Sequence, residues 1–238
     1  MTSYRLETAA SPEDLARIAA QTIASHLDLA LDQRDRAQLA LSGGTTPARA
    51  YALLGQEHLP WERVDVFLGD ERWVDPADAS SNARMLRETL MQSGPGARAA
   101  FHAVPTVSLP SPDASAEAFA AIVERICSGD PPIFDLMVLG LGDDGHTASL
   151  FPGTEAPAVR DRSATVGRGK GLERITLTAP VLSAARQVIF LVSGTAKREA
   201  LQRLLDPSES PERTPAKLVQ PRSTVLVLAD SDAAGGVA

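Results

Sequence analysis

The segment FDLMVL (134–139), followed at once by GLGDDGH (140–146), decides the fold. An almost uninterrupted apolar run of this length is typical of a strand that is buried on both faces, as in a parallel sheet. Polar turns also follow the apolar stretches 38–41, 64–68 and 188–192. Sheets built in this way bind ligands beyond the carboxyl ends of their strands, so these turns mark the expected site.

Helices are expected between the strands. The first opens with Ser11 and Pro12, a capping residue and a first-turn residue, and apolar residues follow at helical spacing. Because strands and helices alternate, we predict one domain over residues 1–238, with an open, Rossmann-like, mostly parallel α/β sheet and helices on both faces. If the strands run parallel, the four polar turns meet at one edge. The expected helices span 11–33, 48–54, 82–90, 111–126 and 197–205, and further strands span 4–8, 174–178 and 225–228.

The bulk composition excludes several classes of partner. The chain has 238 residues, of which 44% are hydrophobic and 4% aromatic, and its formal net charge is −7. Duplex-DNA binders carry a basic excess, and single-strand binders stack bases on aromatic side chains, so we expect no nucleic-acid partner. Positive charge gathered at one place would therefore stand out against the acidic background of the chain.

The single cysteine, Cys127, excludes an intrachain disulfide and fits a reducing compartment. The N-terminal stretch MTSYRLETAASPEDL has no basic flank before an apolar core, so we expect no signal peptide. No apolar run approaches the ~18 to 20 residues that span a bilayer. We expect a cytoplasmic protein that does not bind membranes, and a monomer or a weak dimer.

The turn SGGTTP (42–47) lies between a strand and a helix start. Two glycines let the backbone approach a ligand, and the hydroxyl and N–H groups at a helix start favour an anion. We interpret the segment as a phosphate-binding turn; the alternative is a tight glycine turn with a capped helix. The expected contacts are Ser42, Gly43, Gly44 and Thr45.

The turn SGTAK (193–197) repeats this arrangement after another strand. Lys197 falls in the first turn of the following helix, where a cation is poorly placed against the helix dipole. An anionic ligand in front of that turn offsets the cost, whereas the alternative is a solvated surface lysine. The sequence of this turn leaves both interpretations of Lys197 open.

The segment GDERW (69–73) puts opposite charges at the end of a strand. One interpretation is a surface ion pair, which contributes little to stability. The other is an arginine, Arg72, aimed at a phosphate or a developing oxyanion, with Asp70 orienting a substrate hydroxyl. The sequence leaves both interpretations open.

The loop GLGDDGH (140–146) carries the strongest chemical signature. Asp144 and His146 lie two residues apart, and a carboxylate beside an imidazole can orient it and fix its tautomer, as a general base requires. The three other histidines lack such a setting and are expected to be structural or solvated. No histidine at metal-ligand spacing and no cysteine pair accompany His146, so we expect no metal. A G-x-S-x-G nucleophile motif is also missing from the sequence.

Six blocks of the sequence resemble the 6-phosphogluconolactonases, hydrolases of the pentose phosphate pathway. The blocks occur in family order over nearly the whole chain, and DGHTASLFP is highly specific. They are LSGGTTP (41–47), FLGDERWV (67–74), SNARML (81–86), DLMVLGLGDDGHTASLFPGT (135–154), RITLT (174–178) and SGTAKREAL (193–201). The resemblance implies a NagB-like fold, hydrolysis of 6-phosphogluconolactone to 6-phosphogluconate, and no metal or organic cofactor.

The resemblance also implies roles for individual residues. His146, beside Asp144, falls at the position of the catalytic histidine, and Arg72 looks like an active-site arginine. The segment VLVL (225–228) departs from the family, where a tryptophan is often found, and we expect this change to affect packing rather than chemistry. The residues implied to bind the substrate are Ser42, Gly43, Gly44, Thr45, Asp70, Asn82, Arg174 and Lys197.

Two other functions are alternatives to lactone hydrolysis: deamination or isomerisation of an amino sugar phosphate, and sugar-phosphate sensing without catalysis. Amino-sugar-phosphate deaminases and isomerases share a DGH loop but carry a glutamate soon after it, whereas TASLFP, without an acid, follows His146. A sugar-phosphate sensor without catalysis usually carries a DNA-binding helix-turn-helix, for which the short N-terminal segment leaves no room. We therefore predict lactone hydrolysis, with water activated by His146.

Overall fold

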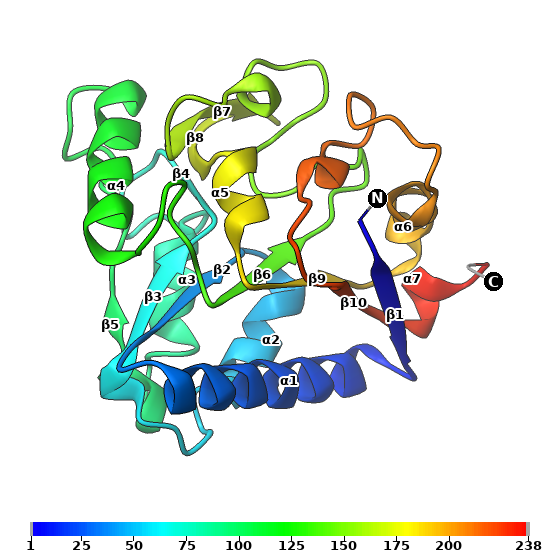
Figure 1. The fold of residues 1–238 in the computed structure, drawn as a ribbon, viewed down its shortest axis with the longest axis horizontal. Coiled ribbons are helices and arrows are strands. Elements are labelled where there is room, and N and C mark those ends of the chain that lie inside the picture. Colours follow the sequence, from blue (N-terminus) through cyan, green and yellow to red (C-terminus); the bar gives the residue numbers. More distant parts are fainter. Residues whose placement is uncertain (1, 237–238) are drawn as a thin grey trace.

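The apolar runs form a seven-stranded central sheet in which every neighbouring pair of strands is parallel (Figure 1). A computed structural model describes residues 2–236 of the protein. The strands lie in the order β1-β10-β9-β6-β2-β3-β5, which confirms the predicted parallel sheet. Their bounds are β1 Tyr4–Ala9, β2 Ala37–Leu41, β3 Val64–Leu68, β5 Ala100–Phe101, β6 Leu136–Gly140, β9 Gln187–Val192 and β10 Val225–Asp230.

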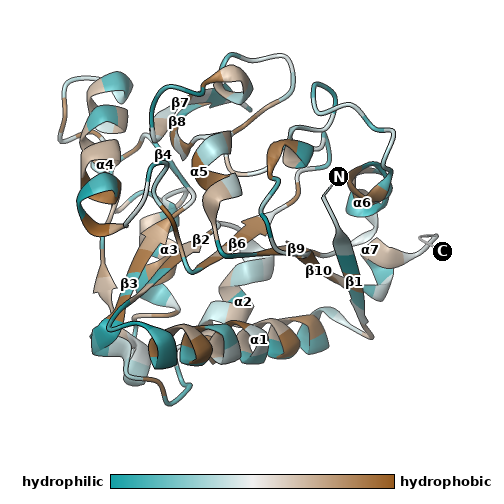
Figure 2. Ribbon diagram, in the orientation of Figure 1, coloured by the Kyte–Doolittle hydropathy of each residue, from teal (hydrophilic) through white to brown (hydrophobic). Residues whose placement is uncertain are grey.

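Helices cover both faces of this sheet, as predicted. In Figure 1, α1 and α2 run along one side of the strands and α5 lies on the other. Ser11 caps α1 by accepting a hydrogen bond from the backbone N–H of Asp14 at 3.1 Å. Apolar and polar residues alternate along α1 in Figure 2, because one stripe of the helix packs on the core. The bounds are α1 Pro12–Gln33, α2 Thr45–Leu54, α3 Asn82–Glu88, α4 Pro112–Ile126, α5 Ala179–Ala184, α6 Arg198–Leu205 and α7 Ser231–Ala234.

Some helix boundaries differ from the predicted ones. α2 begins at Thr45 rather than at residue 48, because proline is tolerated in a first helical turn and Pro47 stands there. α6 begins at Arg198, after a 3-10 turn. The sequence pattern does not predict α5 and α7, which are too short for a helical period to show. The 3-10 turns are Trp61–Arg63, Pro95–Arg98, Ala156–Ala158, Thr195–Lys197 and Pro215–Leu218.

The strand predicted over 174–178 belongs to a second, three-stranded antiparallel sheet rather than to the central one. This sheet has the order β4-β8-β7, with β4 at Asp70–Arg72, β7 at Ala164–Gly169 and β8 at Leu172–Leu177. A two-residue turn joins β7 to β8, and such a short connection allows only antiparallel pairing. α4 packs against β7 and β8. The small sheet thus starts directly after β3 and forms a wall beside the carboxyl edge of the central sheet.

The order of the strands places the predicted turns together. From β2 the sheet continues through β3 to β5 on one side, and from the adjacent β6 through β9 to β10 on the other. A crevice forms at such a switch in direction, outside the carboxyl ends of the strands. Because β9, β6, β2 and β3 are consecutive neighbours and parallel, their four turns lie at one edge, as predicted. Within residues 2–236, no helix has the length and apolar character needed to cross a membrane.

Candidate active site

A cleft of about 290 Å³ opens at this edge. Its wall is built from the turns that follow β2, β3 and β6, from the small sheet, and from the turn after β9. The predicted site residues in the wall are Ser42, Gly43, Gly44, Asp70, Arg72, Asn82, His146, Arg174 and Lys197. Gly140, Leu141, Gly142, Ala148 and Lys170 complete the wall.

Two predicted residues lie beside the cleft rather than in its wall. Asp144 contacts the side chain of His146 from behind. Thr45 lines a neighbouring depression with Thr46, Arg49 and Ser193, because it is the first residue of α2 and follows Gly44 away from the cleft. A direct contact between the Thr45 side chain and a ligand in the cleft is therefore not supported.

The loop that follows β6 holds His146 against Asp144. A carboxylate oxygen of Asp144 accepts a hydrogen bond from the backbone N–H of His146 at 3.0 Å and also contacts imidazole Nδ1. Gly142 leaves the room this needs, since a Cβ there would lie 2.0 Å from Nδ1 of His146. Gly145 closes the loop with a φ of +88° and donates its N–H to the carbonyl of Gly142 at 3.0 Å. The glycines of the loop thus serve the geometry of the histidine.

The protonation states of this pair suit a general base. Burial lowers the pKa of His146 below its ordinary value, although the neighbouring Asp144 carboxylate works in the opposite direction. Burial opposes ionisation of Asp144, but hydrogen bonds from His146 and the charge of Lys170 outweigh it and lower the pKa of Asp144. At neutral pH the imidazole is therefore neutral and the carboxylate is charged.

Asp70 and Asn82 connect the walls of the cleft. The Asp70 carboxylate accepts a hydrogen bond from the Ser149 hydroxyl at 2.5 Å. The Asn82 side chain donates to the carbonyl of Asp70 at 2.8 Å, and it fills the space beside Gly43, where a Cβ would lie 1.9 Å from its Oδ1. These contacts hold the turn after β2 close to the turn after β3.

Two arginines stand in the wall with unused hydrogen-bonding capacity. Arg72 donates from its guanidinium to the carbonyl of Ser80, and Arg174 lies 3.8 Å from the Asp70 carboxylate and 5.3 Å from the ring of Phe151. Within the described residues, Nε of each arginine is buried without a hydrogen-bond partner. Burial lowers the pKa of Arg174, and the charge of Arg72 acts in the same direction. Buried polar groups are normally paired, so these atoms indicate a ligand.

Glu71 corrects the first interpretation of the GDERW segment. Its carboxylate is buried and does not form an ion pair with Arg72; it accepts hydrogen bonds from the backbone N–H groups of Arg72, Asn82 and Ala83 at 2.7 to 2.8 Å. An acid suits the positive end of α3, and it fixes the segment that presents Asn82. Glu71 therefore forms neither an exposed ion pair nor a free surface charge at the end of this strand.

The two predicted anion-binding turns differ. At the first turn, no side chain within residues 2–236 caps the helix start at Gly44, the residue before α2. The second is closed, because the hydroxyl of Ser193 and the N–H of Gly194 both donate to the Asp230 carboxylate, the latter at 3.1 Å. Asp230 therefore takes up two of the donors that 193–197 was predicted to offer an anion, and Lys197 lines the cleft.

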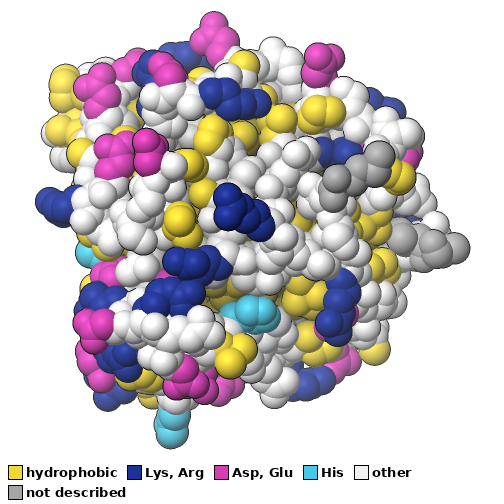
Figure 3. All heavy atoms as spheres, in the orientation of Figure 1, with side chains coloured by type: hydrophobic (Ala, Val, Ile, Leu, Met, Phe, Trp, Pro, Cys, Tyr) yellow, Lys and Arg dark blue, Asp and Glu magenta, His cyan; other side chains and the backbone are white. Residues whose placement is uncertain are grey.

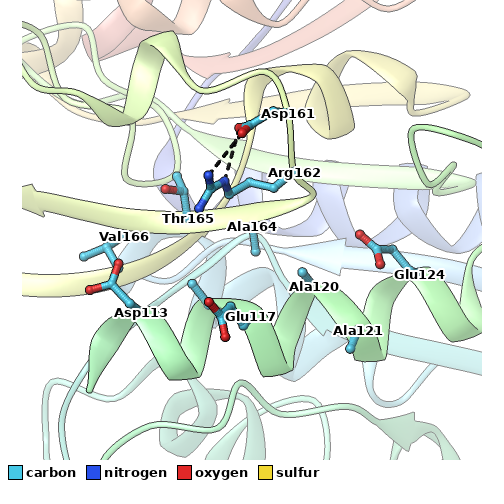
Figure 4. Close-up of a pocket in the computed structure, with 11 residues that line it drawn as sticks. Asp113, Glu117, Ala120, Ala121, Glu124, Asp161, Arg162, Ala164, Thr165 and Val166 are labelled. Atoms are coloured by element: carbon cyan, nitrogen blue, oxygen red, sulfur yellow. Dashed lines mark hydrogen bonds and ion pairs between the residues drawn. The ribbon is translucent and has the colours of Figure 1, made fainter. Parts of the chain in front are cut away.

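Charge distinguishes this cleft from a second cavity of similar size, between α4 and β7 (Figure 4). The carboxylates of Asp113, Glu117, Glu124 and Asp161 line that groove over a floor rich in alanine, and Arg162 is paired with Asp161 at 3.1 Å. An anionic substrate is repelled there. In the cleft, by contrast, four Lys or Arg side chains face a single carboxylate, that of Asp70.

Positive charge is therefore concentrated in a chain that is acidic overall. On the face drawn in Figure 3, several Lys and Arg side chains lie near the centre, whereas Asp and Glu side chains lie mainly toward the margin. Such a distribution attracts anions to the site. Within residues 2–236, no group of three or more His, Cys, Asp or Glu side chains is arranged to hold a metal ion.

Comparisons with known proteins agree on one family. Residues 10–228 match the family model described as glucosamine-6-phosphate isomerases/6-phosphogluconolactonase. A 6-phosphogluconolactonase of Synechocystis sp. is 40% identical over 214 residues, which cover 89% of each chain. The crystal structure of a 6-phosphogluconolactonase from Shewanella baltica superposes with a TM-score of 0.87 at 29% identity, covering 95% of this chain and 97% of that one.

A deaminase is also similar in structure. A monomeric glucosamine-6-phosphate deaminase of the NagB superfamily has a TM-score of 0.81 at 22% identity, and the match covers 97% of this chain and 98% of that one. At this identity the likeness shows the fold alone, which is thus NagB-like as expected. Because one fold can carry out several reactions, the reaction of this protein has to be inferred from the residues of the cleft.

Proposed function

Because the chain belongs to the family of glucosamine-6-phosphate isomerases and 6-phosphogluconolactonases, we propose that it hydrolyses 6-phosphogluconolactone with His146 as the general base. The relatives named 6-phosphogluconolactonase support the reaction, which belongs to the pentose phosphate pathway. The observation that carries the mechanism is that His146, held by Asp144, lines a cleft with two arginines whose Nε atoms have no partner within residues 2–236.

The phosphate of the substrate binds at the start of α2. The N–H groups of Gly43 and Gly44 stand at an uncapped helix start, where the helix dipole favours an anion, and Lys197 adds a positive charge. Ser42 supports the turn through a bond from its backbone N–H to the Tyr51 hydroxyl at 3.2 Å. With the phosphate bound there, the lactone carbonyl at the other end of the sugar lies toward His146.

His146 activates water. Asp144 occupies Nδ1, so Nε2 takes a proton from water while the hydroxide oxygen bonds to the lactone carbonyl carbon. The oxyanion that forms is stabilised by Arg72 and Arg174. When it collapses, the bond from the carbonyl carbon to the ring oxygen breaks, and His146 returns its proton to that oxygen. The products are a free hydroxyl group and a carboxylic acid, which ionises.

Deamination or isomerisation of an amino sugar phosphate is the rival reaction. The family's deaminases were expected to carry a glutamate soon after the DGH loop, but Thr147, Ala148 and Ser149 stand there, and Ser149 is bound to Asp70. No described acid other than Asp70 lines the cleft. Incubation with glucosamine 6-phosphate should therefore release no ammonia.

Ring opening of freshly generated 6-phosphogluconolactone tests the proposal directly. The lactone is made in the cuvette from glucose 6-phosphate, and its disappearance is followed with and without the protein at pH 7. We expect decay far above the spontaneous rate. Decay at the spontaneous rate, together with ammonia release from glucosamine 6-phosphate, would replace lactone hydrolysis by the rival reaction.

We also propose that the protein is a single domain, that it is cytoplasmic, and that it is a monomer or a weak dimer. The family match over residues 10–228 supports a single domain over the whole chain. A free, buried Cys127 fits a cytoplasmic location. The cleft wall is built within one chain, which is compatible with a monomer or a weak dimer, and sedimentation at micromolar concentration would distinguish these from a stable oligomer.

A further inference from the structure

Lys170 lines the cleft from an unusual backbone position. It stands at the tip of the hairpin that joins β7 to β8, where Gly169 pairs with Leu172. The φ angles are +53° at Lys170 and +79° at Gly171. Two consecutive positive φ angles are typical of tight hairpin turns, but the first position usually carries Asn, Asp or Gly. A lysine is strained there.

Strain of this kind is confined to the cleft. Among residues 2–236, two non-glycine residues have a positive φ, Ala148 at +47° and Lys170 at +53°, and both line the cleft. Strained residues persist where the surrounding fold holds them, and they cluster at functional sites. The conformation of Lys170 therefore indicates a function for its side chain.

Asp143 holds the ammonium group of Lys170 in the free protein. Nζ of Lys170 donates to the Asp143 carboxylate at 2.7 Å and lies 3.9 Å from that of Asp144. The hydrogen bond from Lys170, with a smaller contribution from the charge of Lys197, lowers the pKa of Asp143 to about 2. Two cations from distant segments, both in the wall of the cleft, thus act on one exposed carboxylate.

We propose that Lys170 is a ligand for the substrate's phosphate, and that Asp143 holds its ammonium group until the phosphate displaces the carboxylate. The proposal rests on the proposed function, which supplies the phosphate. A phosphate group carries more charge than a carboxylate and offers three acceptor oxygens. An exposed ion pair such as Lys170–Asp143 is weak, so a ligand held at the same time by Lys197 and the start of α2 can replace it.

Calorimetric binding of 6-phosphogluconate and of inorganic phosphate tests this exchange. Lys170→Met keeps the aliphatic stem and removes the charge, and it should weaken both ligands by roughly tenfold. Lys170→Arg should recover most of the loss. Arg168→Met removes a cation from the same hairpin outside the cleft, where Arg168 pairs with Glu173 at 3.3 Å, and should bind both ligands as the wild type does.

Asp143→Asn tests whether Lys170 binds phosphate or only forms a structural ion pair with Asp143. If Asp143 competes with phosphate, this variant should bind both ligands about two- to fivefold more tightly. The double variant should then match Lys170→Met. Wild-type affinity in Lys170→Met, or unchanged or weaker binding in Asp143→Asn, would overturn the proposal. A protein that shows the expected binding pattern but opens the lactone only at the spontaneous rate would instead refute the proposed function.

Discussion

Arg72 and Arg174 occupy directly opposite positions on β4 and β8. Side chains at such positions point to the same side of an antiparallel sheet, and like charges there destabilise the folded state. Both residues line the cleft, and Nε of each lacks a partner within the described residues. Keeping two cations in this arrangement costs stability, which fits our proposal that they stabilise an oxyanion.

The first prediction concerns Arg174→Met, which removes one of the two charges and keeps an apolar stem beside Phe151. We expect kcat/KM to fall by roughly 10²-fold because oxyanion stabilisation is weakened. We expect Tm to rise by about 1 to 3 °C because the repulsion is relieved. Lactone assays and thermal unfolding measure the two effects. If both activity and Tm fall, the arginine has a structural role instead.

The second prediction concerns the room beside the imidazole. In Gly142→Ala, the new Cβ would lie 2.0 Å from Nδ1 of His146 and 2.6 Å from the Asp144 carboxylate. The histidine must move, so kcat should fall by at least about tenfold. Gly69→Ala is the matched control at the carboxyl end of β3 in the same sheet, because the nearest atoms to its added Cβ would lie at 3.7 and 3.8 Å. Equal activities of the two variants would argue against this account of His146.

The third prediction concerns Glu71, which binds the first turn of α3. Glu71→Gln turns one acceptor into a donor that faces backbone N–H groups, so the free energy of unfolding should fall by about 2 kcal/mol. Urea unfolding measures this loss. Glu88→Gln, on the same helix, removes an exposed carboxylate paired with Arg84 and should cost less than about 0.5 kcal/mol. Similar losses for both variants would contradict the proposed cap.

These contacts show what the sequence can and cannot predict. The turns after β2, β3 and β6 were predictable, because an apolar run followed by glycine and polar residues indicates a buried strand and its carboxyl end. The first strand and the tip of the hairpin, ATVGRGKG (164–171), were not, because glycines and charges interrupt this segment. Lys170 was missed for this reason. It has no signal other than its position between two glycines.

Long-range partners set a second limit. The turn 193–197 has the same composition as an anion-binding turn, yet Asp230, which lies 36 residues from Gly194, accepts the N–H of Gly194 and the hydroxyl of Ser193. Similarly, GDERW allows a surface ion pair as one interpretation, because nothing in the segment shows that the side chain of Glu71 is buried. Which polar group is satisfied within the protein depends on packing that the local sequence does not contain.

The fourth prediction separates chemistry from binding. His146→Ala should lower kcat by about 10²- to 10⁴-fold, the usual contribution of a positioned base. Its dissociation constant for 6-phosphogluconate should stay within about threefold of the wild type, because the phosphate is held by the start of α2 and by lysines. Ring-opening assays and calorimetry measure the two. If His146→Ala lost turnover and product affinity to a similar extent, His146 would not act in catalysis alone, and this prediction would be wrong.

The fifth prediction is the pH dependence of kcat/KM. The base must be neutral, so kcat/KM should fall tenfold per pH unit below the pKa of His146, which burial places below about 6.5. In Asp144→Asn, the charge that favours the protonated imidazole is lost, so the pKa of His146 should fall and the acid limb should move to lower pH.

The plateau of the Asp144→Asn profile should nevertheless drop. The amide neither stabilises the imidazolium that forms in the transition state nor holds the tautomer that a carboxylate selects. Profiles of kcat/KM between pH 4.5 and 8.5, in buffers of constant ionic strength, measure both the position of the acid limb and the height of the plateau. An acid limb that moves to higher pH in Asp144→Asn would contradict the coupling of His146 to Asp144. Activity that increases toward acid in the wild type would mean that His146 acts in its protonated form, and the assignment of the base would have to be abandoned.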